Sequence, residues 1–74
     1  MKSKSYINQL RESKNRSERT FAEAVYSLAQ SQGFYGRLIR DIESMDDSSF
    51  RELRTTLKEK DFKDTLDVVL WLEA

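Results

Sequence analysis

The chain contains no cysteine, no histidine and no proline, and only two glycines among its 74 residues. Without cysteine or histidine it can form no disulfide, and it lacks two of the three side chains that usually hold zinc. The same absence removes the commonest general base and the best side-chain nucleophile. We therefore expect a protein that is not an enzyme, that binds no metal and that uses no cofactor. Nothing in the sequence indicates a small-molecule ligand.

Long apolar runs are also missing from the sequence. A membrane-spanning helix needs about 20 mainly apolar residues, and no segment of this chain reaches that length. The basic start of the chain, Met1-Lys-Ser-Lys4, is not followed by the apolar core of a signal peptide. The sequence therefore predicts a cytoplasmic protein that does not bind membranes.

Positive and negative charges balance over the whole chain but not along it. The 13 basic and 13 acidic side chains give a net charge of zero. Six basic and two acidic residues fall within residues 1–19, whereas residues 46–74 hold five basic and eight acidic ones. We expect two parts: a basic N-terminal segment over residues 1–16, which is flexible or a short helix around Tyr6, Ile7 and Leu10, and a helical domain over residues 17–74.

Apolar residues recur at helical spacing in four places, which predicts helices near residues 20–32, 34–45, 49–60 and 62–73. Capping boxes at Thr20–Glu23 and Ser49–Glu52 are typical of helix starts. Asp61 is expected to cap the last helix, with Asp64 in its first turn. The acidic residues Asp61, Asp64 and Asp67 therefore fit the start of this helix better than a cation site. The expected fold is all-α, a small three- to four-helix bundle with short turns.

Gly33 stands between the first two of these helices and is expected to end the first in the left-handed conformation. A β-branched residue is poorly tolerated there, so the sequence predicts that Gly33→Val costs about 1 kcal/mol or more of stability.

The last helix is apolar around most of its circumference. Phe62, Leu66, Val69 and Leu70 are expected to face the core, which leaves Val68, Trp71 and Leu72 on a second apolar arc. Because an uncovered apolar arc marks an interface, these three residues are the candidate protein-binding site. The rival interpretation is that the segment Tyr6–Leu10 folds back and covers Trp71.

Two classes of function fit this chain. We favour a protein-interaction module that binds another protein or forms a homodimer. The alternative is a DNA-binding regulator with a helix-turn-helix over residues 25–44, in which Ala29, Gly33 and Ile39 have suitable spacing. Its nucleic-acid contacts would come from Arg37, Arg40 and Ser44. Tyr35 and Leu38 argue against it, because they lie in the apolar stripe where the motif needs groove-facing polar residues.

Two segments, Ser31-Gln-Gly-Phe-Tyr-Gly-Arg-Leu-Ile-Arg-Asp-Ile42 and Asp61-Phe-Lys-Asp-Thr-Leu-Asp-Val-Val-Leu-Trp-Leu-Glu73, make up about a third of the chain. They resemble parts of small uncharacterised proteins encoded by phages and other mobile elements of Gram-positive bacteria. The resemblance implies a small cytoplasmic accessory protein and assigns no activity and no functional residue.

Overall fold

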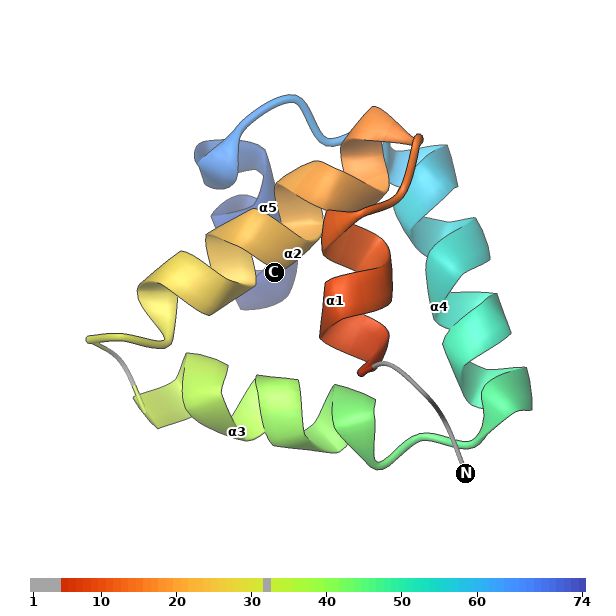
Figure 1. Cartoon of the computed structure of the whole chain (residues 1–74). Coiled ribbons are helices and arrows are strands. Elements are labelled where there is room, and N and C mark those ends of the chain that lie inside the picture. The colour runs from red at the N-terminus through yellow and green to blue at the C-terminus, as the bar shows by residue number, and fades with distance from the viewer. Residues whose placement is uncertain (1–4, 32) are drawn as a thin grey trace.

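The structure, a computed structural model, describes residues 5–31 and 33–74, and in this part of the chain every regular element is a helix. The helices are α1 (Tyr6–Arg11), α2 (Arg16–Leu28), α3 (Gly33–Glu43), α4 (Asp47–Lys60) and α5 (Thr65–Glu73). Helix α2 runs through the middle of the molecule and packs against each of the other four (Figure 1). The all-α prediction is confirmed: residues 5–31 and 33–74 hold five helices, of which α2 to α5 lie near the four predicted segments and α1 lies in the N-terminal segment.

Four of the helices begin at a polar side chain that accepts a hydrogen bond from the backbone N–H three residues later. These pairs are Ser5 with Asn8, Asn15 with Glu18, Asp46 with Ser49 and Asp64 with Asp67, at 2.8–3.1 Å. Such caps satisfy backbone donors that have no partner within the helix. The predicted capping boxes at Thr20 and Ser49 are wrong, because α2 already begins at Arg16 and α4 at Asp47.

One hydrophobic core joins all five helices. Its buried apolar residues are Tyr6, Ile7, Leu10, Phe21, Ala22, Ala24, Val25, Tyr35, Ile42, Phe50, Leu57, Phe62 and Val68. Of the two predictions for the N-terminal segment, flexible or a short helix, the structure shows the short helix, α1. The buried residues of α1 belong to the same core as those of the helical domain. Residues 1–4 of that segment lie outside the described residues.

Helix α1 is held in place by contacts with α3 and α4. The Glu43 carboxylate at the end of α3 accepts hydrogen bonds from the backbone N–H groups of Tyr6 (3.0 Å) and Ile7 (3.1 Å). The Tyr6 ring stacks on Phe50 of α4 with 3.9 Å between centroids, and its hydroxyl donates to Asp47. This hydrogen bond raises the pKa of Tyr6 above its ordinary value. A helix of six residues is unstable alone in water, so these contacts define where it forms.

The left-handed residue of the described chain is Asp61 and not Gly33. Asp61 ends α4 with φ 54° and ψ 54°, whereas Gly33 is the first residue of α3 and has a negative φ. A Cβ atom at Gly33 would also meet no atom within 4 Å. The predicted role of Gly33 is therefore wrong, as is that of Asp61 as the cap of the last helix, which Asp64 caps instead.

The backbone strain that the sequence analysis predicts for a β-branched residue at position 33 is expected at position 61 instead, where φ is positive. We expect Asp61→Val to lower the free energy of unfolding by about 1–2 kcal/mol, because a β-branched residue is disfavoured at positive φ. Asp61→Gly should raise it by up to about 1 kcal/mol for the opposite reason. Urea denaturation measures both changes. Gly33→Val is the matched control, and a loss at Gly33 as large as that at Asp61 would contradict this assignment.

Candidate interaction surface

Helix α5 is positioned by two carboxylates at its start. Asp64 caps the helix by accepting from the N–H of Asp67 at 3.0 Å, and the Asp67 carboxylate accepts from the N–H of Lys63 at 3.0 Å. The carbonyl of Lys63 in turn accepts from Arg16 of α2 at 3.3 Å. These bonds fix the residue at which α5 begins, and hence which of its faces meets the core.

The inner face of α5 packs against α2 and the segment before α5. Val68 is fully buried, and the Trp71 ring lies edge-on to Phe21 at 6.2 Å and tilted against Phe62 at 5.5 Å between centroids. Leu72 is half-buried against the same core. Aromatic pairs at these separations add to the stabilisation that comes from burial alone. The side chains of this face therefore pack in the hydrophobic core.

The outer face of α5 carries two exposed leucines. Leu66 is 61% exposed and Leu70 is 59% exposed, and they lie one helical turn apart on the same side of the helix. Val69, beside them, is half-buried. Helix α5 is thus apolar on both sides but covered on only one, which is unusual for a helix of a monomeric protein.

The structure corrects the predicted arc on α5. Val68, Trp71 and Leu72 face the core, with Val68 fully buried, and two of the predicted core residues, Leu66 and Leu70, face solvent. The prediction began the helix at Phe62, but Phe62 precedes it, and its N–H donates to the Ser17 hydroxyl at 2.8 Å. Of the rival prediction, the short helix is present and belongs to the same core as Trp71; the ring contacts of Trp71 come from Phe21 and Phe62, and Tyr6 stacks on Phe50.

The residues of the DNA-binding alternative lie on the outside of α3 and just after it. Arg37, Arg40 and Ser44 are exposed, and the Ser44 hydroxyl donates to the Arg40 carbonyl at 2.8 Å. Tyr35 is buried, so it does not face outward as a groove-reading residue of that motif would. A Cβ at Gly33 would meet no atom within 4 Å, so the crossing of α2 and α3 does not require a glycine at this position.

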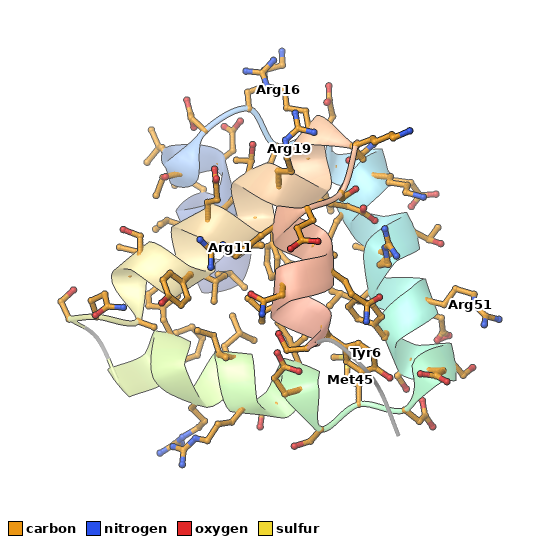
Figure 2. All side chains as sticks on the ribbon, in the orientation of Figure 1. Tyr6, Arg11, Arg16, Arg19, Met45 and Arg51 are labelled. Atoms are coloured by element: carbon orange, nitrogen blue, oxygen red, sulfur yellow. The ribbon has the colours of Figure 1, made fainter. Side chains whose placement is uncertain are left out.

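Other arginines are spread over the molecule, as Figure 2 shows. Arg16 and Arg19 lie at the start of α2, while Arg51 projects from α4 on the side that faces away from α1 and α2. Arg19 donates to the Ser13 carbonyl at 2.8 Å, and Arg11 lies over the Tyr26 ring at 4.6 Å from its centroid. These side chains do not form one basic face of the kind that follows a phosphate backbone.

A buried ion pair lies between α2 and α4, and sequence reasoning missed it. The carboxylate of Glu18, which is fully buried, accepts two hydrogen bonds from Arg54, at 2.8 and 2.9 Å, and a third from the Ser13 hydroxyl. Burial raises the pKa of Glu18, but the bonds from Arg54 and Ser13 outweigh it and leave the pKa below its usual value. The signal was present: the apolar stripe of Phe21 and Ala22, continued one turn back, falls on Ser17 and Glu18.

A pocket of about 240 Å³ lies beside this ion pair, between α1 and α4. Its lining residues are Tyr6, Gln9, Asp47, Phe50, Arg51 and Arg54. Arg54 donates to Glu18, and Asp47 accepts from the Tyr6 hydroxyl. These polar groups of the pocket therefore already take part in hydrogen bonds that hold the helices together. Within residues 5–31 and 33–74, no cluster of three or more acidic side chains could hold a metal ion. No helix of this described part is long and apolar enough to cross a membrane.

Comparisons with family models, with curated proteins and with solved structures find no match to this chain. The resemblance of residues 31–42 and 61–73 to proteins of mobile elements therefore stays a prediction.

Proposed function

We propose that this protein is a non-catalytic interaction module that binds another protein chain through the outer face of α5. The observation that carries the proposal is the exposure of two leucines on one side of α5: Leu66 is 61% exposed and Leu70 is 59% exposed. The opposite side of the helix packs in the hydrophobic core. Each leucine that a partner covers removes apolar surface from water, which favours association.

The small size of the core supports this proposal. A chain of 74 residues gains only about 3–5 kcal/mol from a single core, so burial against a partner is a substantial addition. Sequence-specific DNA binding is the second candidate, and the exposure of Arg37 and Arg40 one turn apart favours it. The zero net charge and the scattered arginines favour the protein-binding function.

Site-specific photo-crosslinking tests the proposal. With p-benzoylphenylalanine in place of Leu70, we expect a covalent adduct to another polypeptide in cells that produce the protein. The same probe in place of Thr55, an exposed residue of α4, should give none. Leu66→Glu in the probe-carrying chain should weaken the association about tenfold, because one apolar anchor is lost and a charge is placed in the contact.

Adducts must be identified by mass and reproduced with purified components. The absence of any adduct from the probe at position 70 would contradict the proposal. Salt-sensitive binding to DNA fragments that Arg40→Ala abolishes would instead favour the second candidate, because counterion release makes such binding fall steeply with salt.

A further inference from the structure

Met45 lies next to the contacts that hold α1 in place. It stands in the turn between α3 and α4, with Glu43 two residues before it and Asp47 two residues after it. Both carboxylates accept hydrogen bonds from Tyr6, one from its backbone N–H and the other from its hydroxyl. Figure 2 shows the Met45 side chain extending from this turn in the direction of Tyr6. A change in the polarity of this side chain therefore acts where α1 is attached.

The Met45 side chain is both accessible and packed. It is half-buried, and it lies against the hydrophobic core to which Tyr6 belongs. The chain contains no cysteine and two methionines, of which Met45 lies within the described residues. Because the oxidation of a thioether depends on its exposure, a half-buried methionine in a turn can be reached by a small oxidant while the protein stays folded. Because the same side chain contacts the core, making it polar has a structural cost.

We propose that Met45 is a modification site for hydrogen peroxide, and that its sulfoxide loosens α1 from the turn between α3 and α4. The sulfur atom donates an electron pair to one peroxide oxygen, so an S–O bond forms while the O–O bond breaks. The departing hydroxide takes the proton of the transferred oxygen and leaves as water. Sulfur loses two electrons and the peroxide gains two, so the step needs no further reactant.

Helix α1 should respond more than the rest of the fold because it depends on contacts from this turn. It has only six residues, and a helix of that length is unstable alone in water. The N–H groups of Tyr6 and Ile7 donate to Glu43, and the Tyr6 ring stacks on Phe50. Helix α5 packs against α2 and takes no part in these bonds, so its backbone amides provide an internal reference.

Peptide mass spectrometry of the folded full chain in dilute hydrogen peroxide tests the modification. We expect Met45 to gain one oxygen at a rate no more than about thirtyfold below that of a short free peptide with the same sequence, because the side chain is partly exposed. A slower rate would mean that the fold shields the sulfur, and it would overturn Met45 as a modification site.

Hydrogen exchange of the oxidised chain tests the effect on α1. The amides of Tyr6 and Ile7 should exchange about tenfold faster after oxidation, while those of α5 should change by less than about twofold. Methionine sulfoxide reductases should restore both the mass and the exchange rates. An acceleration in α5 as large as that in α1, or no acceleration in α1, would overturn the proposed loosening of α1.

Two substitutions at position 45 separate the modification from other effects of peroxide. Met45→Leu keeps an apolar side chain of similar volume, so it should fold as wild type does and show no change in α1 exchange on peroxide treatment. Met45→Gln places a polar side chain of similar length there, and the amides of Tyr6 and Ile7 should exchange faster in this variant without any peroxide. A peroxide response that persists in Met45→Leu would assign the effect to another residue.

Discussion

Replacing Arg54 by leucine is expected to lower the free energy of unfolding by about 3 kcal/mol. Among the described residues, the substitution leaves the Glu18 carboxylate, which is fully buried, with the Ser13 hydroxyl as its remaining side-chain hydrogen-bond donor. An unpaired charge in a protein interior is costly, and breaking a buried pair on one side typically destabilises by about 3–5 kcal/mol. We use the lower end because the Arg54 side chain is 33% exposed. A core that supplies about 3–5 kcal/mol would then be left with at most about 2 kcal/mol, so the melting temperature should fall markedly, as a thermal melt would show.

The double variant Glu18→Leu/Arg54→Leu is the control for this prediction. It removes both charges, so it should recover much of the loss, since apolar pairs can replace buried ion pairs with little change in stability. If the double variant is no more stable than Arg54→Leu, the loss does not come from the unpaired carboxylate.

The dependence of stability on pH is a second readout of the same pair. The pKa of Glu18 is lower in the folded protein than in the unfolded chain, so the unfolded chain binds more protons. The contribution of Glu18 is therefore present above the ordinary carboxyl pKa of about 4.3 and is lost as the pH falls through the lower folded value. The double variant should lose less stability on acidification than wild type does.

Replacing Ser17 by alanine is expected to lower the free energy of unfolding by about 2 kcal/mol. The buried Ser17 hydroxyl donates to the Leu57 carbonyl and accepts from the Phe62 N–H, so one oxygen joins α2, α4 and the segment before α5. Leu57 keeps the hydrogen bond from the Asp61 N–H, but the Phe62 N–H loses its partner in a buried position. Leaving such a donor unsatisfied costs about 1–3 kcal/mol.

Hydrogen exchange gives a local measurement of this effect. In Ser17→Ala the Phe62 amide should exchange much faster than in wild type, because it is no longer hydrogen-bonded. Ser31→Ala is the matched control, since the Ser31 side chain is exposed and should change the stability by less than about 0.5 kcal/mol. An unchanged Phe62 amide in Ser17→Ala would mean that water replaces the hydroxyl.

The helices could be predicted from the sequence because apolar spacing reports burial directly. Phe21 and Val25 lie one turn apart and are both buried in α2, and Leu57 occupies the same kind of position in α4. Helix starts were predicted less well. Thr20 and Ser49 are followed by glutamate three residues later, but Asn15 and Asp46 precede them and cap first.

The inner and outer faces of α5 could not be predicted from the sequence for a physical reason. A helix that is apolar on all sides has no polar face to indicate its orientation, so the orientation depends on where the helix begins. That start is fixed by Asp64 and by the left-handed turn at Asp61, which three-dimensional packing selects. The Glu18–Arg54 pair was missed for a related reason: a charged residue is ordinarily exposed, and only its partner 36 residues away makes burial tolerable.

The cap that Glu43 places on α1 has a consequence for folding during synthesis. The backbone groups of Tyr6 and Ile7 obtain these hydrogen bonds from a residue 36–37 positions later in the chain. At about 5–20 residues per second, a ribosome needs roughly two to seven seconds to add that stretch. During this interval the segment around Tyr6 has neither the Glu43 carboxylate nor the Phe50 ring, so α1, although made early, becomes stable only after α3 and the start of α4 have been translated.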